Sequence, residues 1–248
     1  MVALPTQGAT LDPREILSRW ATFLGFSNPQ PIEFEVPLMA GFGYKLRGKT
    51  TGVTVTVQGE REVARARQRV AGEVTLRDDW RVANSANVTA GWVEIVVVRT
   101  GPSTCQSNVT LYDPVWNLLA KIELGSALFT EDVYNTRLGQ LKNTTNTWLL
   151  SPDLTQWSRS HYASKPLQTP KGIIPEEYPP NRFVNTRPYL VISPEGDLWS
   201  RAVPHLPTGL GVNPWTFTPL LSAPMEVPFV HTLLTVCHVA FFNLNEPT

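Results

Sequence analysis

Apolar residues recur at every second position along much of the chain, and this period of two predicts β-strands. In residues 32–38 the alternate positions are Ile, Phe, Val and Leu with glutamates between them, so one face of an extended segment is apolar. Many residues in such segments are β-branched, which favours a pleated, half-buried surface over a helix. The segments with this pattern are 32–38, 44–47, 53–57, 74–76, 92–98, 189–192 and 198–203.

Two other segments have helical spacing. Asp12 is a good N-cap, Pro13 suits the first helical position and Gly25 suits a helix end, so a helix is predicted between them. Its apolar stripe consists of Ile16, Leu17, Trp20, Ala21 and Leu24. Asp113-Pro114 repeats this opening, and a second helix is predicted to end at Gly125. Its stripe consists of Val115, Leu118, Leu119 and Ile122.

Prolines recur every few residues from Ser151 onward and predict long loops there. Residues 194–197, Pro-Glu-Gly-Asp, predict the turn of a hairpin. Residues 229–244 are apolar on both faces, as expected of a strand in the middle of a covered sheet, whereas residues 60–70 fit a helix and a strand equally well. We find no internal repeat and no domain boundary.

The fold class predicted from these patterns is mainly β, with two short helices and long proline-rich loops. One domain is expected over residues 1–248, with a helix-bearing N-terminal extension over 1–30 and a β-sandwich over 31–248.

Composition restricts the partners that can be expected. Lys plus Arg equals Asp plus Glu at 21 each, so no overall field draws the chain to nucleic acid or anionic lipid. No apolar run reaches the roughly 18 residues that a membrane span needs, and no secretory signal opens the chain, so no membrane partner is expected. Charged residues make up only 17% and there are eight Trp, a composition that favours burial of surface against neighbouring proteins.

Residues 43–50, Gly-Tyr-Lys-Leu-Arg-Gly-Lys-Thr, match the phosphate-binding loop pattern. That loop works only when a helix starts directly after its Thr, because the amides of the helix N-terminus bind the phosphates. The sequence after Thr50 is instead Thr-Gly-Val-Thr-Val-Thr-Val, which predicts a strand. A nucleotide hydrolase that uses Lys49 and Thr50 is kept as an alternative.

No other residues form a convincing active site. On a strand, His231 and Cys237 would lie about 20 Å apart, and no pair of histidines has the spacing of a zinc site. We therefore expect no enzyme, no cofactor and no metal. A disulfide between Cys105 and Cys237 is left open, as is carbohydrate binding by a monomeric sandwich through exposed Trp148 and Trp157. The candidates for non-specific RNA contact are Arg61, Arg65, Arg67 and Arg69.

The N-terminal quarter resembles capsid proteins of picorna-like viruses, of the comovirus or secovirid type. The similarity consists of Leu17-Ser-Arg-Trp20, the following strand that ends at Pro37-Leu38, and Tyr44-Lys-Leu-Arg-Gly48. The middle of the chain does not align with that family. The resemblance implies an eight-stranded jelly roll that assembles with other coat subunits into an icosahedral virion around genomic RNA. Synthesis in the host cytoplasm is implied as well.

The apolar segment from Pro204 to Pro228 is expected to make the subunit contacts. Its prolines remove amide donors, which argues against an interior strand, and a long apolar loop on a monomer would be a liability. Trp215 is the expected buried anchor at the subunit interface. The interface residues predicted in this loop are Trp215, Phe217, Leu220 and Leu221.

Overall fold

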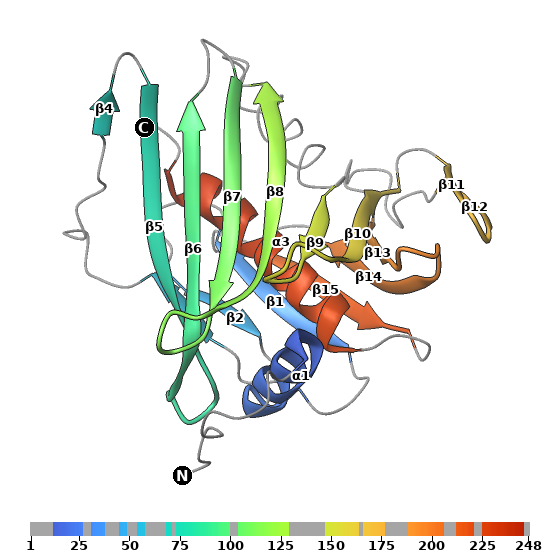
Figure 1. Ribbon diagram of the computed structural model, residues 1–248, viewed down its shortest axis with the longest axis horizontal. Helices are drawn as coiled ribbons and strands as arrows, with labels where there is room; N and C mark the ends of the chain where they lie inside the picture. Colours follow the sequence, from blue (N-terminus) through green and yellow to red (C-terminus); the bar gives the residue numbers. More distant parts are fainter. Residues whose placement is uncertain are drawn as a thin grey trace.

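The computed structural model describes residues 12–26, 31–37, 45–48, 54–57, 68–70, 73–99, 104–128, 147–163, 166–176, 188–205, 212–220 and 225–245. These residues contain two helices, α1 (Pro13–Phe23) and α3 (Glu226–Asn245) (Figure 1). The strands are β1 (Ile32–Pro37), β2 (Lys45–Gly48), β3 (Thr54–Val57), β4 (Gln68–Val70), β5 (Glu73–Ala83), β6 (Thr89–Arg99), β7 (Thr104–Tyr112), β8 (Leu118–Leu128), β9 (Trp148–Leu150), β10 (Gln156–Tyr162), β11 (Leu167–Thr169), β12 (Gly172–Ile174), β13 (Tyr189–Ile192), β14 (Leu198–Pro204) and β15 (Val212–Pro219).

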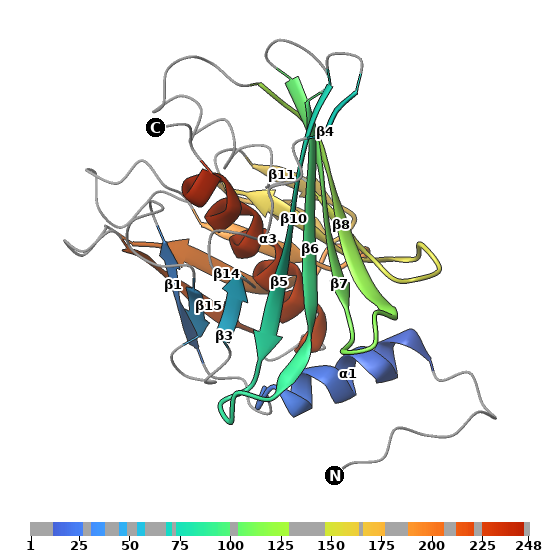
Figure 2. The same ribbon diagram turned by 90° about the vertical axis from the view of Figure 1, so that its left-hand side faces the viewer.

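The described strands form one 13-stranded antiparallel sheet and a separate β11–β12 hairpin. The order in the large sheet is β3-β2-β1-β15-β14-β13-β10-β9-β8-β7-β6-β5-β4, and β3 also pairs with β5. This last pairing closes the sheet on itself, so that its two halves face each other in Figure 2. Closure leaves few backbone donors and acceptors unpaired at a sheet edge.

Helix α3 runs through the inside of the closed sheet. It contacts strands on every side, among them β1, β7, β10 and β15, and the ribbon shows the sheet curving around it (Figure 2). Residues 227–238 are buried without a break. A helix that is apolar all round is stable only when it is covered on all sides, and the closed sheet provides this cover.

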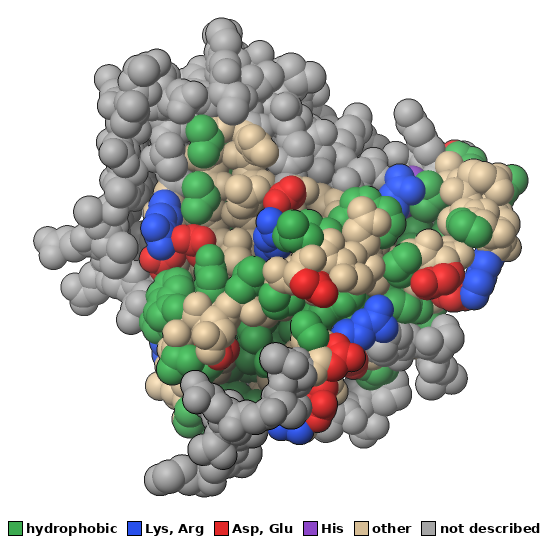
Figure 3. Space-filling view, viewed as in Figure 1, with side chains coloured by type: hydrophobic (Ala, Val, Ile, Leu, Met, Phe, Trp, Pro, Cys, Tyr) green, Lys and Arg blue, Asp and Glu red, His purple; other side chains and the backbone are tan. Residues whose placement is uncertain are grey.

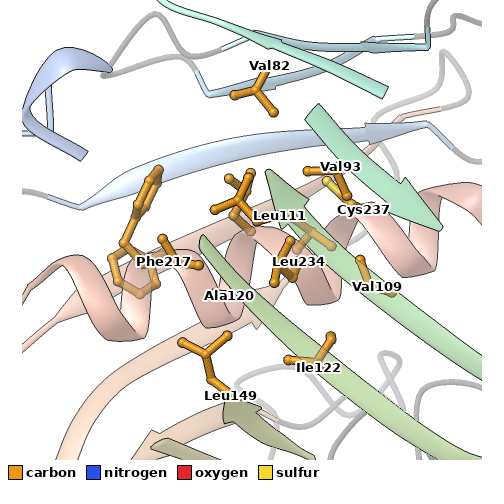
Figure 4. Packing of buried hydrophobic residues seen from close by; sticks show 14 of the residues in the cluster. Val82, Val93, Val109, Leu111, Ala120, Ile122, Leu149, Phe217, Leu234 and Cys237 are labelled. Carbon is orange, nitrogen blue, oxygen red and sulfur yellow. The ribbon is translucent and has the colours of Figure 1, made fainter. Parts of the chain in front are cut away.

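The core lies between α3 and the inward faces of the strands (Figure 4). In β6 the side chains of Val93, Ile95 and Val97 are buried while those between them are half-buried, which is the period of two that the sequence predicts. Figure 4 shows strand residues such as Val109 and Ile122 directed at the helix.

Helix α1 packs at one end of the closed sheet. The Asp12 carboxylate accepts a hydrogen bond from the Arg14 amide at 2.9 Å, and Gly25, with φ of 87°, follows the last turn. Leu17 and Trp20 are buried in the same core as α3, and the Trp20 indole donates to the Ala90 carbonyl at 2.9 Å. The predicted N-cap and terminating glycine are confirmed, and so is the stripe except for Ile16, which is exposed.

Four hairpin turns in the described residues share the same hydrogen-bonding pattern. This recurrence was not predicted from the sequence. They are residues 84–88, 113–117, 151–155 and 193–197. In each turn the first residue is Asn, Asp or Ser, and its side-chain oxygen accepts from backbone amides further along the turn. The fourth residue has positive φ in every case: Asn87 59°, Trp116 67°, Leu154 68° and Gly196 101°. The predicted hairpin turn at 194–197 is thereby confirmed.

The mainly β class is confirmed, and two finer predictions need correction. Residues 113–125 form a turn and strand β8, because Asp113 caps a hairpin rather than a helix. Residues 229–244 belong to helix α3 rather than to a strand. The jelly-roll arrangement stays a prediction; in the described sheet many neighbours, such as β5 to β10, follow one another along the chain.

Candidate functional site

The predicted interface loop contains an interior strand of the protein itself. β15 pairs with β1 on one side and β14 on the other, and Trp215 and Phe217 are 2% and 0% exposed in the core. The prolines are accommodated because Pro214 and Pro219 lie near the ends of the strand. The predicted placement of Trp215 and Phe217 in a subunit interface is therefore wrong, because neither side chain reaches the surface. Leu220 is half-buried, and Leu221 lies outside the described residues.

The described residues contain only part of the other sequence candidates. Arg61, Arg65 and Arg67 lie outside the described residues, and Arg69 is in β4 with its side chain not described. Of the phosphate-loop match, Lys45–Gly48 forms β2, and the next described residues form β3. Two paired strands do not supply the helix that a phosphate loop requires.

The tryptophans proposed for carbohydrate binding do not form an exposed pair: Trp157 is buried and Trp148 is half-buried. Cys237 is a free, buried thiol, so it does not pair with Cys105. Within the described residues, no group of three or more His, Cys, Asp or Glu side chains could hold a metal ion.

The most concentrated polar chemistry surrounds His231, in the middle of α3. Its Nδ1 lies 2.8 Å from the Ser158 hydroxyl, and its Nε2 lies 2.9 Å from the Thr147 hydroxyl. Burial lowers the pKa of His231 to about 3, so the ring is neutral. One ring nitrogen therefore donates to a hydroxyl and the other accepts from one.

Two more hydrogen bonds extend this cluster along the helix. The Thr235 hydroxyl donates to the His231 carbonyl at 2.9 Å, so the Tyr189 hydroxyl, 2.8 Å away, must donate to Thr235. Burial raises the pKa of Tyr189 and keeps it protonated for this role. The Ser160 hydroxyl accepts from the Thr147 amide at 2.9 Å.

A serine hydroxyl beside an imidazole is the arrangement of a nucleophile and its base. Here Ser158 and His231 are both 0% exposed, and the second ring nitrogen faces a threonine rather than a carboxylate. Because the pair is fully buried, we interpret it as structural: the Ser158 bond fixes α3 against β10, and the bond between Tyr189 and Thr235 fixes it against β13.

The surface feature with most potential for recognition is on the hairpin turns. Each of the first three turns exposes a large hydrophobic side chain, and the group is named the apolar rim: Val88, Val115, Trp116 and Leu154. The three turns join β5 to β6, β7 to β8 and β9 to β10. Because neighbouring strands from β5 to β10 are antiparallel, these turns all lie at the same end of the strands. Figure 3 shows hydrophobic side chains gathered over the lower ends of β5 to β8.

Aromatic stacking joins the first two hairpins of the rim. The Trp116 ring lies parallel to the Trp92 ring of β6, with centroids 5.5 Å apart and an interplanar angle of 5°. Tyr112 approaches the same Trp116 ring at 5.3 Å. The stack holds the second turn over β6 and leaves Trp116 45% exposed.

The four rim residues come from three separate turns, so no window of the sequence contains the patch. The turn signals Asp113-Pro114 and Ser151-Pro152 were present, but the first was assigned to a helix N-terminus and the second to a proline-rich loop. A search for Asn, Asp or Ser four residues before a second polar residue would have found three of the four turns, because the first turn ends at Val88.

No family model, curated protein or solved structure matches this chain. Of the helices in the described residues, neither combines the length and hydrophobicity needed to cross a bilayer.

Proposed function

We propose that this protein is a non-catalytic docking protein that attaches to a larger surface through the apolar rim. The observation that carries the proposal is that exposed hydrophobic residues recur on three turns at the same end of the strands. Single exposed hydrophobics need no explanation, but here four of them lie on three turns at the same end of the strands, and a gathering of this kind indicates an interaction site.

Backbone strain at two rim residues supports the same function. A residue with a large side chain at positive φ costs roughly 1–2 kcal/mol relative to Gly at that position. Trp116 and Leu154 occupy positions where the other two turns have Asn87 and Gly196, which tolerate this conformation. Asn or Gly would relieve this strain at both positions. Trp116 recovers part of the cost through its stack on Trp92, whereas Leu154 is 59% exposed, so local backbone preference does not explain the choice of Leu there.

The filled interior is consistent with action at the surface. α3 occupies the space inside the closed sheet, and its residues 227–238 are in full contact with the strands. A protein built in this way presents its chemistry outward, on turns supported by a rigid sheet.

Fractionation of an extract of the producing cells tests the proposal. The wild type should sediment with particles or membranes, whereas Val115→Asp combined with Trp116→Asn should stay in the supernatant. Ile173→Asp is the matched control, because Ile173 is 66% exposed, Val115 is 65% exposed, and Ile173 lies on the distant β11–β12 hairpin (Figure 1). Equal distribution of all three proteins would refute docking through the rim.

The expectation of an icosahedral coat around RNA stays a prediction. The expected interface anchor, Trp215, is a core residue of the chain itself. Light scattering of the purified protein decides it: a coat subunit gives particles far heavier than the 27.6 kDa chain.

A further inference from the structure

We infer that the surface bound by the apolar rim is the interfacial layer of a zwitterionic lipid bilayer, into which the three turns insert without spanning it. This inference rests on the proposed docking function and names its partner. It differs from the expectation of no membrane partner, which considered only continuous apolar runs and net charge.

The turns can enter an apolar medium because their backbone amides already have partners. In the first turn the Asn84 Oδ1 accepts from the amides of Ala86 and Val88, both at 3.0 Å. In the second, the Asp113 Oδ1 accepts from the amides of Val115 at 2.9 Å and Asn117 at 2.8 Å. Hydrocarbon offers no hydrogen bonds, so a backbone group left unpaired there would cost several kcal/mol.

This internal saturation favours lipid over a protein partner. Protein interfaces typically carry about one hydrogen bond per 100–200 Å², many of them made by loops. In the third turn the Leu154 amide donates to the Ser151 carbonyl at 3.0 Å, and the Thr155 amide donates to the Ser151 hydroxyl at 2.8 Å. The tips expose the four hydrophobic side chains of the rim together with polar side chains such as those of Asn117 and Asp153.

The aromatic stack has the composition of a membrane-water interface. Trp and Tyr are enriched at that level of a bilayer, where one part of the ring system is apolar and another remains hydrated. Trp116, Trp92 and Tyr112 form the stack directly beside the exposed Val115.

The charges on the rim indicate a zwitterionic rather than an anionic lipid surface. The second and third turns carry the carboxylates of Asp113 and Asp153, and the Asp153 carboxylate is held by Ser151 and Thr155. The one guanidinium at the first turn, Arg81, donates to the Asn87 Oδ1 at 2.6 Å. Two anions and one cation give anionic headgroups no net attraction.

The fourth turn limits the proposed contact to the first three. It has the same backbone design, but its fourth residue is Gly196, and the neighbouring Asp197 forms an ion pair with Lys171 at 2.6 Å. This turn exposes no large hydrophobic side chain among the residues described.

Co-sedimentation of the purified full chain with phosphatidylcholine vesicles tests the inference. The wild type and Ile173→Asp should bind equally, and the Val115→Asp/Trp116→Asn variant should lose about tenfold or more in partition coefficient, because binding scales with buried apolar surface. Vesicles with part of the phosphatidylcholine replaced by phosphatidylserine should bind no better, and added salt should have no effect. Brominated lipid should quench the tryptophan fluorescence of the wild type only when vesicles are bound.

Each alternative outcome has a definite meaning. Absence of wild-type binding to vesicles overturns the lipid partner, while rim-dependent sedimentation in extracts would still support docking to a protein. Binding confined to phosphatidylserine vesicles and abolished by salt also overturns it, because headgroup charge would then be the cause. Val88→Asp is a second variant on a different turn, and it should weaken binding even if the double variant is poorly folded. Unchanged binding by both variants overturns the inference.

Discussion

Acidification from about pH 7 to about pH 5 is expected to destabilise the fold through the histidines of the central helix. His231 and His238 are both buried in α3, and burial lowers the pKa of each to about 3. In the unfolded chain both have the ordinary pKa of about 6.5. Between these two values the unfolded state binds protons that the folded state does not.

The sign and size follow from this difference. Stability rises with pH wherever the unfolded state binds more protons, so it is complete above about pH 6.5 and declines as the pH falls toward 3. At pH 5 the solution lies about 1.5 pH units below the ordinary histidine pKa of about 6.5. Protonation of His231 in the unfolded chain therefore lowers the free energy of the unfolded state by about 2 kcal/mol, and the folded state gains nothing comparable. His238 contributes a similar amount, so the total is about 4 kcal/mol, a large share of a typical stability of about 5–15 kcal/mol.

Urea denaturation at several pH values in this range measures the effect. Carboxylates titrate mainly below pH 5, so the histidines dominate in this window. His231→Gln retains a side chain that can donate and accept but does not titrate, so its loss of stability between pH 7 and pH 5 should be about half that of the wild type. A wild-type stability that is independent of pH here would refute the reasoning. So would an imidazole NMR signal of folded His231 that titrates near 6.5, a measurement that remains possible if the Gln variant does not fold.

Two further predictions concern the packing around this core. In a Cys105→Ser background, Cys237 should react with a thiol reagent only as fast as the protein unfolds, because it is buried and burial raises the pKa of its thiol; rapid labelling under native conditions would contradict its place on α3. Gly91→Ala should lower the thermal midpoint, since the new Cβ would lie 2.1 Å from the Tyr112 carbonyl oxygen, and overpacking of this kind typically costs about 1–3 kcal/mol. An unchanged midpoint would show that β6 and β7 can separate freely at this position.

The strands were the most predictable part of the fold, because an inward face that packs on α3 imposes a period of two on the sequence. β1, β6 and the β13–β14 hairpin lie where the alternation predicted them. The N-terminal helix was equally predictable, since Asp12, Pro13 and Gly25 are local signals that tertiary contacts do not override.

Helix α3 was missed because periodicity carries no information when every side of an element is covered. A buried strand and a buried helix both appear as continuous apolar runs, and only length distinguishes them. The run from 229 to 244 is longer than strands usually are, and this should have outweighed its β-branched content. His231, Thr235 and His238 were further signs of a helix, because they recur at intervals of three to four residues.

Trp215 was assigned to a loop at a subunit interface because the proline content of its segment was taken as evidence against an interior strand. The amide that proline lacks matters only where the ladder needs a donor, and Pro214 and Pro219 lie toward the two ends of β15. Once the closed sheet is known, an apolar segment of alternating Trp215 and Phe217 is the expected neighbour of β1, whose Phe34 pairs with Trp215.

The four related turns separate what the fold requires from what it merely permits. All four share the side-chain cap and the positive φ, so these features belong to the hairpin. The side chain at the positive-φ position differs: Asn87 and Gly196 suit the conformation, whereas Trp116 and Leu154 oppose it. For Trp116 the stack on Trp92 returns part of the cost, about 0.5–1.5 kcal/mol, but Leu154 is 59% exposed and has no aromatic partner in the described part of the chain. The requirements of the hairpin therefore explain the caps and the positive φ of these turns. They do not explain the exposed hydrophobic side chains of the rim, which a docking surface would explain.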